Sequence, residues 1–249
     1  MAKTLANIRT QTRTYLDEAT EADWEDSEVD QSINDGYHEV VTSVMETYEE
    51  FYVVTDLFDS AANQQEYGTA DGLPTDIFKI RRLEVNYDVS NSNSIARRAI
   101  PVSIDSVLRD LGNSALGITV YRNPAYYLIG SSTGSSGIKI GIIPKPTAVG
   151  TDAIKLWYVP VQADLTSSSD APNIPYADRY YKLISLYAAA TLLRKGQQEE
   201  EVAQNYMKEF QFGLSKMQQQ LEDRVADSGK SIVDTAGMDN DFDSGYSTF

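Results

Sequence analysis

The sequence predicts an α+β protein, in which a small antiparallel β-sandwich or barrel is inserted into a discontinuous helical bundle. Three observations support this class. Apolar residues recur at helical spacing near the N-terminus, β-branched and aromatic segments alternate through the middle, and helical spacing returns beyond Pro175. The chain of 249 residues is long enough for one or two domains. We expect a bundle of 1–60 and 165–226, a β domain of 61–164, and a tail of 227–249 that is disordered unless docked.

Four helices are expected. A short amphipathic helix covers 4–18, and a longer one runs from about Ser27 to Glu50, with Asp26 or Ser27 as its N-cap. A third helix, over 176–195, is apolar nearly all round and should be the most buried, with Gly196 as its C′ residue. A fourth covers about 198–225.

The middle of the chain predicts short strands. Ile77–Asp88 alternates except for a change of face at Arg81-Arg82, which a β-bulge would absorb. Gly130–Gly137 (GSSTGSSG) is a hairpin tip, and one or two helical turns are expected at Ser106–Leu111. Residues 52–55 (YVVT) are β-branched and aromatic, and further strands are expected at 97–104, 118–122, 126–129, 138–143 and 154–159.

The net charge of −16 is concentrated in one segment. There is no Lys or Arg between Arg13 and Lys79, whereas residues 14–78 contain 18 of the 37 acids. The other 19 acids are balanced by 21 bases, so the rest of the chain is nearly neutral. Binding to the phosphate backbone of a nucleic acid requires clustered Lys and Arg, so an acidic protein of this kind is not expected to bind nucleic acid in that way.

Catalytic, metal and cofactor sites are not indicated. The chain has no Cys and a single His, His38, which we expect to be a solvated surface residue, so Ser-His-Asp and thiolate chemistry are excluded. The acids around Asp26 fit no calcium-loop pattern. A carboxylate-dependent hydrolase stays open as an alternative, because any acidic chain offers carboxylate pairs. Neither Met1–Glu18 nor the apolar run Leu183–Leu193 reads as a signal peptide or a membrane span.

Two further groups of residues suggest interaction surfaces. The basic pairs Arg81-Arg82 and Arg97-Arg98 are either solvated strand faces or a patch that docks an acidic partner, including the acidic segment of a neighbouring identical subunit. The tail carries three aromatic residues among acids, Phe242, Tyr246 and Phe249. They are either part of a mobile tail or anchors that become ordered on a partner.

The order of several motifs resembles the head-to-tail adaptor (connector) proteins of tailed bacteriophages. The resemblance covers most of residues 1–225, with extra residues between Tyr67 and Leu73-Pro74 as a departure. The motifs are Thr4–Arg9 (TLANIR), Trp24–Val29 (WEDSEV), Ile33–Tyr37 (INDGY), Leu73–Ile77 (LPTDI), Ile143–Pro146 (IPKP), Leu156–Pro160 (LWYVP), Ile174-Pro175 and Tyr181–Arg194.

This resemblance implies a non-enzymatic structural protein of the virion neck, made in the host cytoplasm. Such adaptors form a homo-oligomeric ring, usually a dodecamer, that binds the portal, extends the DNA channel and docks a tail or nozzle protein. DNA passes through during genome ejection without sequence-specific binding, and no membrane or cofactor is involved. Another neck or tail-tube protein of a phage is the alternative within this class.

The resemblance also suggests roles for the unusual residues. The tail aromatics Phe242, Tyr246 and Phe249 would reach the portal, and Arg81, Arg82, Arg97 and Arg98 would form an inter-subunit basic patch. In a ring, the acidic segment repeats as a belt that either lines the DNA channel or forms an interface. Its candidate residues are Asp26, Glu28, Asp30, Asp35, Glu39 and Glu46.

Overall fold

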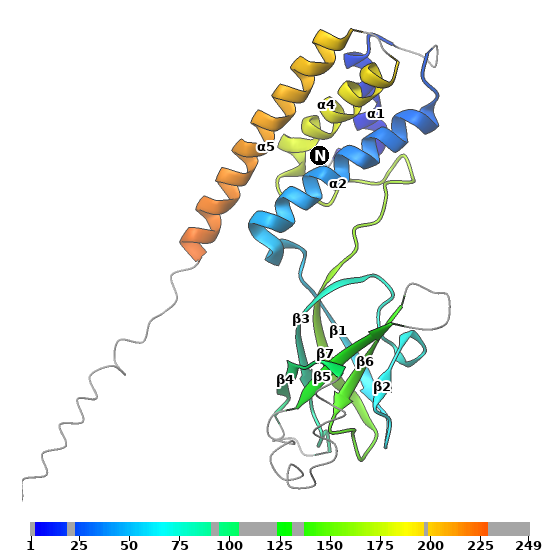
Figure 1. Ribbon diagram of the computed structural model, residues 1–249, viewed down its shortest axis with the longest axis vertical. Coiled ribbons are helices and arrows are strands. Elements are labelled where there is room, and N and C mark those ends of the chain that lie inside the picture. Colours follow the sequence, from blue (N-terminus) through cyan, green and yellow to red (C-terminus); the bar gives the residue numbers. More distant parts are fainter. Residues whose placement is uncertain are drawn as a thin grey trace, which may run out of the picture. The chain divides into compact units, whose positions relative to one another are not determined.

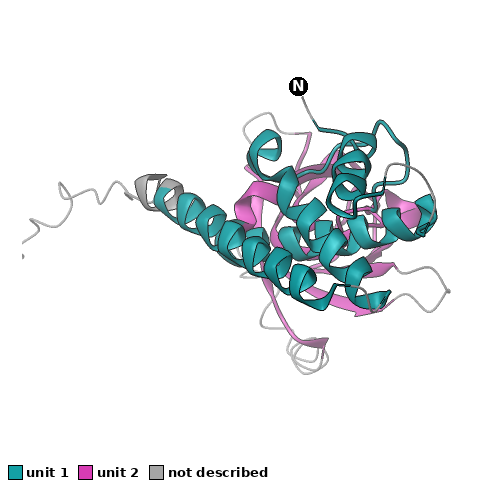
Figure 2. Ribbon diagram, turned by 90° about the horizontal axis from the view of Figure 1, so that it is seen from above, with its two compact units in different colours: residues 1–48, 164–249 teal, residues 49–163 magenta. Residues whose placement is uncertain are grey.

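The computed structural model describes residues 3–18, 23–90, 95–104, 124–130, 137–196 and 199–228. They form two compact units, one from residues 1–48 and 164–249 and the other from residues 49–163 (Figure 2). The first unit is helical, and the second, built mainly of strands, is inserted between its two halves. The predicted α+β class, a discontinuous bundle with an inserted β unit, is confirmed.

The helical unit is organised around one central helix. It contains α1 (Leu5–Tyr15), α2 (Asp26–Tyr48), α4 (Ala177–Lys195) and α5 (Glu200–Ser228), and α4 contacts the other three (Figure 1). Burial on nearly all sides of α4, from Tyr180 to Leu193, matches its even distribution of apolar residues. The other helices each turn one apolar stripe inwards, as Val29, Ile33, Tyr37, Val40 and Val44 of α2 illustrate.

Glycine permits a close contact between α2 and α4 in this unit. A Cβ atom on Gly36 of α2 would lie 3.0 Å from the Tyr187 ring and 3.1 Å from the Ile184 carbonyl oxygen of α4. Gly196 ends α4, but with φ −75° rather than the left-handed conformation that a C′ glycine supplies. A Cβ atom there would lie 2.9 Å from the Trp24 ring, so close packing explains this glycine.

The loop before α4 caps the N-terminus of α1. The backbone N–H groups of Leu5 and Ala6 donate to the carbonyl oxygens of Asp170 and Ser168, at 2.7 and 3.2 Å. The first turn of a helix has no intrahelical acceptors for these donors. The loop is held in turn by the Asp170 carboxylate, which accepts from the backbone N–H groups of Thr166 and Ser167.

The second unit is a curled sheet of seven strands in the order β1-β7-β3-β4-β5-β6-β2. A 3₁₀ turn, η1 (Glu49–Tyr52), precedes the first strand, and a second, η2 (Thr69–Asp71), follows β2. The strand bounds are β1 Val54–Ser60, β2 Glu66–Tyr67, β3 Ile77–Val85, β4 Arg97–Pro101, β5 Ala125–Gly130, β6 Ile138–Ile143 and β7 Gly150–Pro160. Every strand contributes to a single core, which includes Phe58, Tyr67, Leu83, Ala99, Tyr126, Ile140 and Leu156.

The sheet departs from the purely antiparallel arrangement expected. β4 and β5 pair in parallel, with Ile100 opposite Ala125 and Pro101 opposite Tyr126. A parallel pair requires a long crossover, and the connection from Val102 to Pro124 has the necessary length. Most of that connection, with the predicted strand 118–122 and helical turns 106–111, lies outside the described residues. The predicted bulge is present, since the β3–β7 register shifts between Ile80 and Arg82.

Candidate interaction surfaces

The start of the acidic segment is neutralised by two arginines of α1. Arg9 donates from Nε and Nη2 to the two carboxylate oxygens of Asp30, at 2.8 and 2.5 Å, and from Nη1 to Asp26 at 3.1 Å. Arg13 donates from Nη2 to Asp26 at 2.7 Å and to the Trp24 carbonyl oxygen at 3.0 Å. Asp26 is therefore a helical residue that binds arginines, and it is not the predicted N-cap.

Arg13 also forms the most buried ion pair of this cluster. Its Nη1 lies 3.2 Å from the Glu18 carboxylate, and the two side chains are 9% and 7% exposed. The other Glu18 oxygen accepts from the backbone N–H groups of Asp23 and Trp24, at 2.7 and 3.2 Å. The cluster thereby fixes the link between α1 and α2 around a buried charge pair.

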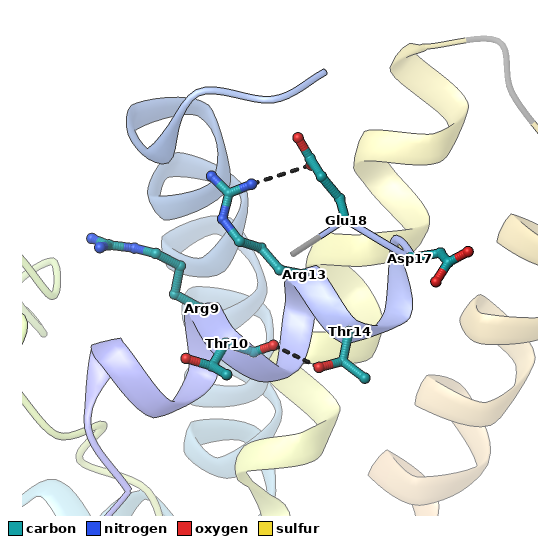
Figure 3. Close-up of a pocket in the computed structure, with 6 residues that line it drawn as sticks. All are labelled: Arg9, Thr10, Arg13, Thr14, Asp17 and Glu18. Atoms are coloured by element: carbon teal, nitrogen blue, oxygen red, sulfur yellow. Dashed lines mark hydrogen bonds and ion pairs between the residues drawn. The ribbon is translucent and has the colours of Figure 1, made fainter. Parts of the chain in front are cut away.

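A hollow of about 410 Å³ lies over this cluster. Its lining residues are Arg9, Thr10, Arg13, Thr14, Asp17 and Glu18 (Figure 3). Figure 3 shows the Arg13 guanidinium directed at Glu18, while Asp17 points away from both. Both arginines are bound by carboxylates of their own chain, so the hollow is a structural feature of the bundle and offers no free cation for an anionic ligand.

The six predicted acidic-face residues fall into two groups. Asp26 and Asp30 bind arginines, and Glu28 lies 2.8 Å from Lys195 Nζ, whose hydrogen bond lowers the Glu28 pKa. Asp35, Glu39 and Glu46 are exposed and form no ion pair within the described part of the chain. Burial, followed by the charges of Glu39 and Asp35, raises the pKa of Tyr187 on α4. Of the six acids, Asp35, Glu39 and Glu46 on the outer face of α2 are therefore the ones that no described cation neutralises.

The predicted basic patch is also divided. Arg81 is bound within its own unit, 2.7 Å from Glu49 and 3.6 Å from Glu50, and Lys79 shares Glu49. Arg82 pairs with Glu84 of the same strand. Arg97 and Arg98 are exposed on β4, with Arg98 opposite Glu84 in the ladder and no ion pair to either arginine among the described residues.

An aromatic residue that the sequence did not single out lies beside Arg82. The Trp157 ring on β7 has the Arg82 guanidinium 5.1 Å and the Lys155 ammonium 4.6 Å from its centroid. Arg82 and Trp157 are paired in the ladder, and Leu83 and Leu156 beside them point into the core. Strand alternation therefore places both cations and the ring on the outer face of the sheet. The spacing of Lys155 and Trp157 by two residues was the available sequence signal.

The remaining predicted residues are His38 and the three aromatic residues of the tail. His38 is 41% exposed, as expected, and its Nε2 lies 2.6 Å from Asp164. The described residues hold no group of His, Cys, Asp and Glu able to bind a metal ion. Within the same residues, no helix is long and apolar enough to cross a membrane. Phe242, Tyr246 and Phe249 lie outside the described residues.

A comparison with protein families identifies the chain. The model of a family described as SU10 adaptor protein matches residues 3–232, nearly the whole chain. The protein is therefore of the phage adaptor class, with a helical bundle interrupted by a β unit. Within that class it belongs to the SU10 adaptor protein family. The resemblance to head-to-tail adaptors is confirmed, while a search of curated proteins finds no match.

Proposed function

We propose that this protein is a head-to-tail adaptor that forms a closed ring beneath the portal of a tailed phage. The ring, of about twelve copies by the resemblance, extends the DNA channel and gives the tail or nozzle protein its docking platform. The observation that carries this proposal is the family match over residues 3–232. The protein acts by position in the virion neck and catalyses no reaction.

Charged surfaces support assembly with other protein subunits. The chain carries unneutralised acids on α2 and exposed basic residues on the outer face of the β unit, so opposite charges lie on different parts of one subunit. A closed ring requires two different, complementary surfaces per subunit. Arg82, Arg97 and Arg98 are proposed to contact an acidic surface of an adjacent subunit. Arg82 also pairs with Glu84 of its own strand, and Arg81 is bound by Glu49 and Glu50.

The acidic face has two proposed uses. Asp35, Glu39 and Glu46 would either line the channel, where negative charge repels DNA phosphates, or meet a neighbouring subunit. The C-terminal aromatics Phe242, Tyr246 and Phe249 are proposed to anchor the ring to the portal, because buried aromatic side chains contribute strongly at small interfaces.

The test uses capsids of the encoding virus that lack this protein. Full-length protein is added, and the neck is imaged by cryo-electron microscopy. We expect a ring at the portal vertex and recovery of tail attachment. A protein that binds elsewhere on the particle, or that leaves the portal vertex unchanged, would disprove the adaptor function.

The proposed anchoring of the C-terminal aromatic residues to the portal is tested by a separate variant. Replacing Phe242, Tyr246 and Phe249 by Ala should weaken capsid binding by roughly tenfold or more, because hot-spot aromatics contribute at least this much. Ser244→Ala with Ser247→Ala in the same segment is the control and should bind like wild type. Equal binding of the two variants would rule out the aromatic anchor.

A further inference from the structure

The outer face of α5 carries an exposed aromatic residue between two lysines. Phe212 is 64% exposed, and Lys208 and Lys216 lie one turn before and one turn after it. The Lys216 ammonium lies 4.2 Å from the centroid of the Phe212 ring. The buried stripe of this helix, which includes Ala203, Phe210, Met217 and Leu221, lies on the opposite side. We call Lys208, Phe212 and Lys216 the α5 face.

The α5 face is positively charged and unneutralised. Neither lysine forms an ion pair with any described residue. A phenylalanine of this exposure leaves a large apolar surface in water, and aromatic residues flanked by cations are frequent centres of protein interfaces. Two lysines are too few to hold a nucleic acid, which needs several phosphate contacts. The chemistry therefore fits a small acidic protein surface with some apolar area.

Such a surface is present on α2 of the same protein. Asp35, Glu39 and Glu46, which we call the α2 face, lie opposite the buried residues Ile33, Tyr37, Val40 and Val44. They also lack ion pairs among the described residues, in contrast to Asp26 and Asp30. Thr42 is exposed between Glu39 and Glu46 and has little bulk to obstruct an aromatic ring.

The two faces match in length. At about 1.5 Å of rise per residue, Lys208 and Lys216 are about 12 Å apart along α5, and Asp35 and Glu46 are about 16 Å apart along α2. Both helices turn their buried sides towards α4 in one compact unit. The two outer faces point away from that core, so neither is covered by the other in a single copy.

We propose that the α5 face of one copy packs against the α2 face of a second copy. Phe212 lies over Thr42, and the lysines pair with Asp35, Glu39 and Glu46. The contact joins two different surfaces, so it propagates from copy to copy and forms a ring where the rotation between successive copies closes. The inference rests on the proposed ring function and assigns the acidic face to an interface between subunits.

Charge exchange tests the pairing on full-length protein. The variant Lys208→Glu with Lys216→Glu should lower both self-association in ultracentrifugation and assembly on capsids by roughly tenfold or more, since close like charges oppose docking. Asp35→Lys with Glu39→Lys should have the same effect. Combining all four changes should restore assembly, because each interface then has opposite charges again. Circular dichroism confirms that each variant is folded.

A matched control separates this contact from the change in net charge. Lys145→Glu with Lys182→Glu alters two exposed lysines that belong to neither face and should assemble like wild type. If the α5 variant also assembles like wild type on capsids, the proposed contact is wrong while the adaptor function stands. If wild type does not bind capsids at all, the adaptor function fails and the contact with it.

Cross-linking tests which faces meet, using the absence of native cysteine. Thr42→Cys and Ser215→Cys are exposed positions on α2 and α5, and Ser168→Cys is a control in the loop before α4. With a short bis-maleimide and capsid-bound protein, a mixture of the first two variants should give cross-linked dimers. Either variant alone, or mixed with the control, should give none. Cross-links within the Thr42→Cys protein alone would show that α2 meets α2 and overturn the proposal.

Discussion

At the scale of single residues, Arg13 is the charge whose loss the bundle should tolerate least. It binds Glu18, Asp26 and the Trp24 carbonyl oxygen from a nearly buried position. Arg13→Met should lower the free energy of unfolding by about 3 kcal/mol, because it leaves the Glu18 carboxylate buried beside an apolar side chain. Chemical denaturation of the full-length protein measures this loss.

The reason for that loss is testable by removing the second charge. Adding Glu18→Gln to Arg13→Met should restore at least half of the lost stability, since a neutral amide oxygen still accepts from Asp23 and Trp24. Lys195→Ala is the matched control, because its pair with Glu28 is solvent-exposed and should contribute little. A double variant as unstable as Arg13→Met would show that packing by Arg13, rather than charge, is lost.

Asp170 should make the stability of the loop that caps α1 depend on pH. Hydrogen bonds from the backbone N–H groups of Ser167 and Thr166 lower its pKa below the ordinary value for aspartate. A depressed folded-state pKa contributes stability above the unfolded pKa, and that contribution is lost as the pH falls through the folded value. The loop that caps α1 should therefore loosen below about pH 4.

Two measurements check this pH dependence. Carboxyl NMR should show Asp170 titrating below the ordinary range for aspartate. Asp170→Asn should make the protein less sensitive to acid between pH 5 and 3, a range set by the aspartate pKa. An Asp170 resonance that titrates in the ordinary aspartate range would contradict the role of the two backbone hydrogen bonds.

Single residues also mark where sequence reasoning failed. Asp26 is of a residue type that is preferred at N-caps, and Gly196 follows a helix as a C′ glycine does. In the structure, Asp26 binds Arg9 and Arg13 of another helix, and Gly196 makes room for the Trp24 ring. Both outcomes depend on residues distant in space rather than on local preference, and local patterns carry no information about such partners.

At the scale of elements, the β5–β6 hairpin depends on one glycine. Gly141 lies opposite Tyr127, and a Cβ atom on it would be 2.0 Å from the tyrosine ring. Gly141→Ala should force the buried Tyr127 ring out of place and destabilise the protein by about 1–3 kcal/mol. Thermal unfolding provides the measurement.

The same hairpin supplies the control. Gly130 ends β5, and a Cβ atom there would meet nothing within 4 Å, so Gly130→Ala should leave stability nearly unchanged. Combining Gly141→Ala with Tyr127→Ala should cost less than the sum of the two single changes, because the clash disappears. Additive losses would show that the tyrosine ring is not the obstacle.

Whether a segment forms a helix or a strand was more predictable from the sequence than which other segment it pairs with. Apolar periodicity placed the four α-helices of the described residues, and the change of face at Arg81-Arg82 located the β3 bulge. Each of these patterns reports a local side-chain direction. The parallel pairing of β4 with β5 was missed. Alternation shows which side of a strand is buried, but Ile100 carries no local signal that Ala125 lies beside it in parallel.

At the scale of the whole molecule, the structure shows which of the acids behind the net charge of −16 are paired with basic residues. Within the 14–78 segment, Arg9 and Arg13 pair with Glu18, Asp26 and Asp30. Lys195 pairs with Glu28, and Lys79 and Arg81 pair with Glu49. Asp35, Glu39 and Glu46, on the outer face of α2, have no such partner among the described residues and are available to other proteins. From composition alone, the net negative charge indicated only weak binding to nucleic acid. The structure shows that part of this charge forms a negatively charged surface on one helix of this member of the adaptor family.

The division into two units predicts how the chain responds to being cut. Residues 49–163 have their own core, to which all seven strands contribute, so this segment should fold when expressed alone, with a β-type circular dichroism spectrum and cooperative unfolding. Residues 1–48 should not, because α1 and α2 bury their apolar stripes largely against α4.

Each unit contains one tryptophan, Trp24 or Trp157, whose fluorescence reports its unfolding. In full-length Trp24→Phe, the Trp157 transition should match that of the isolated 49–163 segment. A large difference would mean that the β unit draws its stability from the helical unit, and that the inserted unit is not an independent fold.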